Sequence, residues 1–133
     1  MKVILDTNVF VSGVFFSGPP YKILEAWREK RVTLVVSPAI LDEYQRVAED
    51  LADKFPGVDI EPVLELLAIH ALLVDAPGLP DQVCTDADDD MFLACAIASG
   101  ANIITSGDKA LLKTSGYAGI QVIPPSTFVS KFL

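Results

Sequence analysis

The chain has 133 residues, of which 51% are hydrophobic and 21% charged, and its formal net charge is −8. This length suits one hydrophobic core, so we expect a single domain over residues 1–133. No apolar run approaches the roughly 18 residues that cross a bilayer, and the first residues lack the pattern of a signal peptide. The composition predicts a cytoplasmic globular protein with no membrane partner. The acidic charge argues against the basic surface that is usual in nucleic-acid-binding proteins.

In chain order, the predicted elements alternate between short apolar runs, which favour strands, and helical patterns. Strands are predicted at residues 3–5, 32–36, 72–74, 102–105 and 120–123. Helices are predicted at about residues 19–31, 37–55, 59–70, 88–99 and 108–113, with a last one after residue 126. Proline in a first turn, as at Pro38, and glycine after a last turn, as at Gly100, mark helix ends. This alternation predicts a three-layer α/β/α fold with a mainly parallel central sheet of about four to five strands.

Four acidic residues from separate segments are predicted to meet at one edge of this sheet. Asp6 ends the first strand, and Asp108 follows the strand at 102–105. Glu43 lies in the second turn of the helix after the second strand, and Asp90 in the first turn of the helix at 88–99. A helix that follows a strand begins at the carboxyl edge of a parallel sheet, where ligands bind in open α/β folds. Crossover connections therefore bring the four acids to one edge.

Helical phase distinguishes Glu43 from its neighbour Asp42. One apolar stripe at helical spacing consists of Ile40, Tyr44, Val47, Ala48 and Leu51. At about 100° per residue, Asp42 lies opposite the centre of this stripe and Glu43 lies at its boundary. We expect Glu43 to reach a half-buried cleft and Asp42 to face solvent.

Each acid also has a simpler structural explanation when it is taken alone. Asp6 can begin a turn with Thr7 and Asn8, and aspartates at helix starts, such as Asp90 and Asp108, commonly cap free N–H groups. Glu43 can be a surface acid. These explanations do not account for a shared edge, because two carboxylates about 4 Å apart repel by roughly 4 kcal/mol at an effective dielectric near 20. A hard divalent cation, Mg²⁺ or Mn²⁺, suits such a set of oxygen ligands.

The remaining chemically active residues form no other recognisable catalytic pattern. His70 is the only histidine and stands among apolar residues, so we expect it to pack near the core. Cys84 and Cys95 are predicted to be reduced and mostly buried. The grouped bases Lys22, Arg28, Lys30 and Arg31 form either a solvated helix face or a patch that contacts phosphate.

Four blocks of sequence carry a resemblance to the PIN domain family. They are Asp6-Thr7-Asn8, residues 37–43 ending in Glu43, Asp88-Asp89-Asp90-Met91-Phe92-Leu93, and Thr105-Ser106-Gly107-Asp108-Lys109. Their order and spacing, over nearly the whole chain, are similar to those of the family. The chain is most similar to the prokaryotic members identified as toxins of toxin–antitoxin pairs, the VapC-type toxins.

The resemblance implies a PIN-like fold and a metal-dependent ribonuclease. Carried over by motif, Asp6, Glu43, Asp90 and Asp108 are the acidic quartet around Mg²⁺ or Mn²⁺, and Asn8 and Ser106 support it. The implied chemistry is in-line attack on the phosphodiester by a water that the cation activates. The implied partners are an RNA substrate, a small antitoxin protein and a second copy of the chain.

The chain departs from the family pattern at two places. Ala87 stands where relatives often have proline, and the functional acid within Asp88-Asp89-Asp90 is uncertain in register, with Asp89 competing with Asp90. Ala110 stands where many relatives carry a further acid. Two alternative functions remain open at this stage, a Mg²⁺-dependent phosphohydrolase and a non-catalytic protein-binding module on the same scaffold.

Overall fold

The computed structural model describes all residues 1–133 and contains one five-stranded sheet in which every pairing is parallel. The spatial order of the strands is β3-β2-β1-β4-β5, so β1 occupies the centre. The strands are β1 (Lys2–Leu5), β2 (Thr33–Val36), β3 (Leu72–Leu73), β4 (Ile103–Thr105) and β5 (Gln121–Ile123). All five lie where the sequence predicted strands, and the predicted parallel α/β architecture is confirmed.

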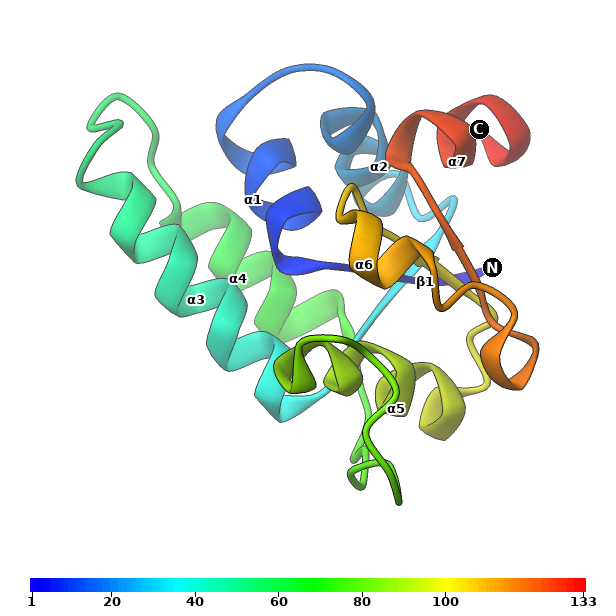
Figure 1. The fold of residues 1–133 in the computed structure, drawn as a ribbon. Coiled ribbons are helices and arrows are strands. Elements are labelled where there is room, and N and C mark those ends of the chain that lie inside the picture. The colour runs from blue at the N-terminus through cyan, green and yellow to red at the C-terminus, as the bar shows by residue number, and fades with distance from the viewer.

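Helices cover both faces of the sheet (Figure 1). They are α1 (Thr7–Phe15), α2 (Pro19–Arg28), α3 (Pro38–Ala52), α4 (Glu61–His70), α5 (Asp90–Ser99), α6 (Lys109–Leu112) and α7 (Pro125–Phe132). Helix α5 packs under β1, β2 and β4, while α2 and α7 pack against each other on the opposite side. Two short 3-10 turns, η1 (Ala87–Asp89) and η2 (Tyr117–Gly119), complete the elements. No helix is long and apolar enough to cross a membrane.

Helix α1 was not predicted from the sequence. Its Val9, Val11 and Gly13 are poor helix formers, so propensity alone did not indicate a helix. One local and one tertiary feature stabilise it. A side-chain oxygen of Asp6 accepts a hydrogen bond from the N–H of Val9 at 2.8 Å, which caps the first turn. The ring of Phe10 stacks on that of Tyr44, with centroids 4.2 Å apart.

Gly13 has a specific packing role in α1. A Cβ at this position would lie 2.7 Å from Leu24 Cδ1 and 2.8 Å from the carbonyl oxygen of Pro20. Only a residue without a side chain therefore allows α1 and α2 to approach this closely.

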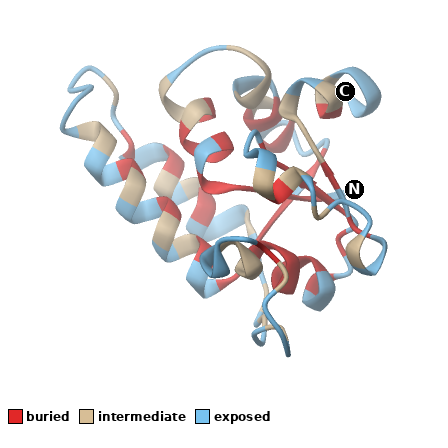
Figure 2. Ribbon diagram, viewed as in Figure 1, coloured by how far each residue is buried: buried red, intermediate tan, exposed pale blue.

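The hydrophobic core lies on both sides of the sheet, and the buried residues in Figure 2 follow the strands. Val3, Ile4 and Leu5 of β1 are each completely buried. Because β1 is the central strand and is covered on both faces, the chain emerges from it at the middle of the carboxyl edge. This places Asp6, the next residue, between the neighbouring strands and helices.

Candidate active site

Five carboxylates from four segments of the chain line one cleft at the carboxyl edge of the sheet. The cleft has a volume of about 270 Å³. Its lining residues are Asp6, Thr7, Asn8, Glu43, Val47, Asp86, Asp89, Phe92 and Asp108. Three of the four acids predicted to meet there, Asp6, Glu43 and Asp108, line it, whereas Asp90 does not. The lining contains five acids and no base.

Asp6 is the most buried acid of the cleft, with 5% of its surface exposed. One carboxylate oxygen accepts the N–H of Val9, and the other accepts a hydrogen bond from the Ser106 hydroxyl. Burial raises the pKa of Asp6, these two hydrogen bonds lower it, and the nearby carboxylates Asp108 and Glu43 raise it, so that the net shift is upward. Asp6 caps helix α1, whereas the simpler explanation offered from the sequence was a turn with Thr7 and Asn8. Carboxylate oxygens retain further lone pairs, so capping leaves it able to bind a cation.

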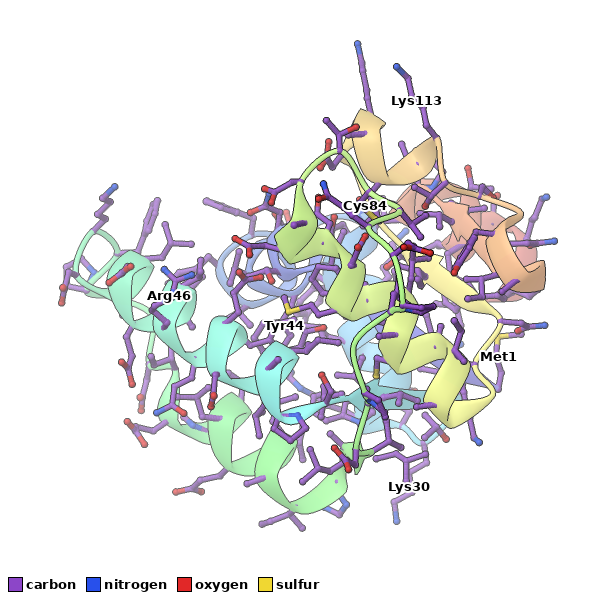
Figure 3. The ribbon with its side chains drawn as sticks, turned by 60° about the horizontal axis from the view of Figure 1, so that its bottom comes forward. Met1, Lys30, Tyr44, Arg46, Cys84 and Lys113 are labelled. Carbon is purple, nitrogen blue, oxygen red and sulfur yellow. The ribbon has the colours of Figure 1, made fainter.

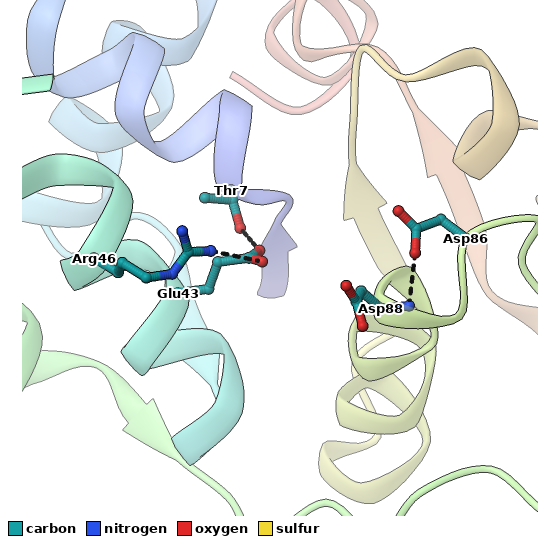
Figure 4. Close-up of polar contacts among 5 residues, drawn as sticks. All are labelled: Thr7, Glu43, Arg46, Asp86 and Asp88. Atoms are coloured by element: carbon teal, nitrogen blue, oxygen red, sulfur yellow. Dashed lines mark hydrogen bonds and ion pairs between the residues drawn. The ribbon is translucent and has the colours of Figure 1, made fainter. Parts of the chain in front are cut away.

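Glu43 reaches the cleft from α3, and Figure 4 shows how its carboxylate is held. The Thr7 hydroxyl donates a hydrogen bond to Oε2, and Nη2 of Arg46 lies 3.6 Å from Oε1. Glu43 is half-buried and Asp42 is exposed. The helical-phase prediction for these two residues is therefore confirmed. Thr7 thus orients Glu43 across a sequence separation of 36 residues.

The carboxylate of Asp90 is bound to the backbone of the preceding loop. It accepts the N–H of Cys84 at 2.7 Å and that of Val83 at 3.1 Å. Burial raises the pKa of Asp90, but hydrogen bonds from the Cys84 N–H, the Cys84 thiol and the Val83 N–H outweigh it and lower the pKa below its usual value. Asp90 therefore does not line the cleft, because its oxygens are turned to the loop that precedes η1.

Asp89 occupies the place in the cleft that was expected of Asp90. Helix α5 begins one residue after it, and its side chain caps no helix N–H group. Burial raises the pKa of Asp89 to about 6, with further contributions from the carboxylates of Asp86, Asp108, Asp6 and Glu43. Helix capping therefore does not explain the position of Asp89. The raised pKa reports that burial, and then the surrounding acids, disfavour the charged form of Asp89.

Asp108, Ser106 and Asn8 complete the predicted set. Asp108 lines the cleft and caps α6 by accepting the N–H of Ala110 at 3.0 Å. Ser106 is completely buried; besides donating to Asp6, its oxygen accepts the N–H of Asp108 at 3.0 Å. Asn8 is exposed at the cleft wall. Ser106 thus connects the first and fourth acids.

The cleft also contains contributors that the sequence analysis missed. Asp86 faces Glu43 across the cleft in Figure 4 and accepts the N–H of Asp88 at 3.0 Å. Tyr44 is buried beneath the cleft, in the interior of Figure 3, and its hydroxyl donates to the carbonyl oxygen of Leu5. Burial raises the pKa of Tyr44 well above its usual value, so it remains a neutral donor. A polar hydroxyl in the middle of the α3 apolar stripe was the available signal for Tyr44.

The donor set of the cleft fits a hard divalent cation, although its geometry is open. No three acidic, histidine or cysteine side chains lie close enough together to hold a metal ion as they stand. The cleft nevertheless offers only oxygen donors, which Mg²⁺ and Mn²⁺ prefer. Burial, and after it repulsion from the neighbouring acids, raises the pKa of Asp6 and of Asp89, and a bound cation would offset this repulsion.

Comparison with known proteins agrees with this architecture. A sequence profile of the PIN domain matches residues 2–110. An uncharacterised protein of Methanocaldococcus jannaschii is 35% identical over 116 residues, covering 84% of this chain and 74% of that protein. A chain in the crystal structure of VapBC2 from Rickettsia felis bound to a DNA fragment from their promoter has a TM-score of 0.61 at 16% identity, covering 92% of this chain and 97% of that one. The chain described here belongs to the PIN domain family, whose members are generally nucleases.

Proposed function

We propose that this protein is a metal-dependent endoribonuclease whose acidic site consists of Asp6, Glu43, Asp89 and Asp108. The observation that carries the proposal is the convergence of these four carboxylates on one cleft from four separate segments. Asp89 replaces the sequence-based assignment of Asp90, because Asp90 is committed to the Val83–Cys84 backbone. Asp86 is a fifth acid at the rim.

Electrostatics support dependence on Mg²⁺ or Mn²⁺. A phosphodiester is an anion, and the chain carries a net charge of −8 with a cleft lining that contains five acids and no base. An RNA backbone would therefore be repelled unless the acids were neutralised. A cation bound by Asp6, Glu43, Asp89 and Asp108 would supply this neutralisation and would polarise the scissile phosphate and a nucleophilic water.

The residues around the acids have separate roles in this proposal. Ser106 and the N–H of Val9 fix the two oxygens of Asp6, and Thr7 fixes Glu43. The acid positions are therefore held before substrate binds. Arg46, which is exposed beside Glu43, and Lys109, which follows Asp108, are the bases best placed to contact flanking phosphates.

We further propose that the protein is the toxin of a toxin–antitoxin pair, acting as a homodimer that a small antitoxin inhibits. The fold shared with a chain of the VapBC2 complex supports this assignment. An exposed aromatic pair provides an apolar surface for a protein partner: Phe16 is 52% exposed and Phe55 37% exposed, with their rings edge to face at 5.4 Å.

Cleavage by purified protein tests the proposal. Labelled single-stranded RNA should be cut internally in Mn²⁺ or Mg²⁺, not in excess EDTA, and Asp6→Asn should abolish cutting. Asp42→Asn is the matched control, because Asp42 is exposed on α3 and lies outside the cleft. DNA of the same sequence tests the choice of RNA. Activity that persists in EDTA or in Asp6→Asn would contradict the proposed site.

A further inference from the structure

A second cleft of about 270 Å³ lies at the opposite, amino edge of the sheet. Its walls come from the end of α2, the start of β2 and the end of α4. Trp27 and Leu66 form its apolar part, and Arg28, Lys30, Thr33 and His70 supply polar groups. In Figure 3, Lys30 lies at the end of the molecule opposite Cys84 and Lys113. This cleft is therefore separate from the acidic one.

Three nitrogen-bearing side chains of this cleft have no partner within the protein. Arg28, Lys30 and His70 form no side-chain hydrogen bond or ion pair, although the chain carries 18 acids against 10 Lys and Arg residues. The nearest acid in sequence, Glu29, is paired with Arg31 at 3.3 Å. His70 was expected to pack near the core, but it is exposed, as are its neighbours Ala68 and Ile69 in the last turn of α4. The cleft thus gathers free donors in an otherwise acidic protein.

The backbone at Lys30 gives an independent indication of function. Helix α2 ends with the N–H of Arg31 bonded to the carbonyl of Ala26 and that of Lys30 bonded to the carbonyl of Trp27. This pattern places Lys30 at the left-handed position that usually holds glycine, and its φ is +63°. A lysine is strained there, whereas glycine is not. Strained backbone angles of this kind cluster at active sites and ligand clamps.

We propose that this cleft binds a phosphate monoester, with Arg28 and Lys30 contacting the phosphate and His70 and Thr33 at its margin. Arg and Lys are the usual phosphate donors. The volume is near the lower end of pockets that hold small molecules, so there is room beyond the phosphate for a sugar or base against Trp27 and Leu66. The phosphate monoester belongs either to a free nucleotide or to the phosphorylated end of an RNA strand. This inference does not depend on the proposed nuclease activity.

Trp27 is the only tryptophan, so its fluorescence reports on this cleft directly. Full-length protein in EDTA is titrated with inorganic phosphate, adenosine monophosphate, and one RNA oligomer bearing either a 5′-phosphate or a 5′-hydroxyl. EDTA keeps divalent cations from recruiting phosphate to the acidic cleft. We expect a saturable change in Trp27 fluorescence with the probes that bear a phosphate monoester or inorganic phosphate. If adenosine monophosphate binds more tightly than the 5′-phosphorylated RNA, the ligand is a free nucleotide. If the 5′-phosphorylated RNA binds more tightly, the ligand is the end of an RNA strand.

Two substitutions at Lys30 separate its charge from its backbone strain. Lys30→Gln and Lys30→Gly should both weaken phosphate binding by about tenfold or more. Lys30→Gly should also raise the Tm by roughly 2–5 °C, since glycine removes the strain. Lys22→Gln on the same helix lies outside the cleft and should bind normally. The inference is overturned by no saturable change with any probe, by unchanged affinity in both Lys30 variants, or by 5′-hydroxyl RNA that binds as tightly as both adenosine monophosphate and the 5′-phosphorylated RNA.

Discussion

The Ser106 hydroxyl donates a hydrogen bond to Oδ2 of Asp6 across 100 positions of sequence. The hydroxyl oxygen of Ser106 also accepts a hydrogen bond from the N–H of Asp108 at 3.0 Å. This buried group therefore holds the acid at the end of β1 in register with the segment that follows β4. The relationship matters for chemistry because the bond stabilises the ionised form of an acid whose pKa burial raises.

Ser106→Ala should shift the pH dependence of metal binding toward higher pH. Without the hydroxyl, the pKa of Asp6 rises further, so the carboxylate becomes available to a cation only at higher pH. Isothermal titration with Mn²⁺ across pH 5 to 8 measures the midpoint. Ser130→Ala, an exposed serine on α7, is the control. An unchanged midpoint in Ser106→Ala would show that this bond does not tune Asp6.

Thr7→Val should lower the rate of RNA cleavage by about 10- to 100-fold, because Glu43 loses the donor that orients it. Valine keeps the shape of the buried side chain, so the fold and its Tm should change little. Thr7→Ser restores the hydroxyl and should recover most of the rate. A Thr7→Ser variant as slow as Thr7→Val would mean that side-chain shape, not the hydrogen bond, is what matters.

The stability of the metal-free protein should fall as the pH rises from about 4 to 6. The pKa of Asp89 is about 6 in the folded protein against an ordinary 3.8, and that of Asp6 is also raised. In this range the folded state binds more protons than the unfolded state, so raising the pH favours unfolding. Urea unfolding in EDTA at several pH values measures this trend. Asp89→Asn should flatten it, and a steep fall that persists in that variant would assign it to other groups.

Asp90→Ala should destabilise the protein by about 1–3 kcal/mol, because two backbone N–H groups of the Val83–Cys84 loop lose their acceptor. Since the pKa of Asp90 is lowered in the folded state, its contribution is present above pH 4 and disappears as the pH falls below its ordinary value. Asp88→Ala is the control: Asp88 is exposed and its carboxylate accepts no hydrogen bond. Equal urea midpoints for the two variants at pH 7 would contradict this role.

The sheet and the position of Asp6 could be predicted because an apolar run such as Val3–Leu5, followed by a helical pattern, indicates a buried parallel strand. Helix α1 could not be predicted, because its residues have weak helix propensity. The cap from Asp6 and the stacking of Phe10 on Tyr44 stabilise it instead. Which residue of Asp88-Asp89-Asp90 lines the cleft could not be predicted either. It depends on the 3-10 turn η1 and on which carboxylate the Val83–Cys84 loop captures, and neither is visible in helical periodicity.

The most direct test of the proposed site compares metal-dependent RNA cleavage by Asp89→Asn and Asp90→Asn at equal folded concentration. Both substitutions remove one negative charge from adjacent residues, and an asparagine at 90 can still accept a loop N–H through its carbonyl oxygen. We predict that Asp89→Asn loses cleavage in Mn²⁺ by at least about 100-fold, whereas Asp90→Asn keeps most of it. Loss of cleavage in Asp90→Asn with near-normal activity in Asp89→Asn would contradict the assignment of the third acid.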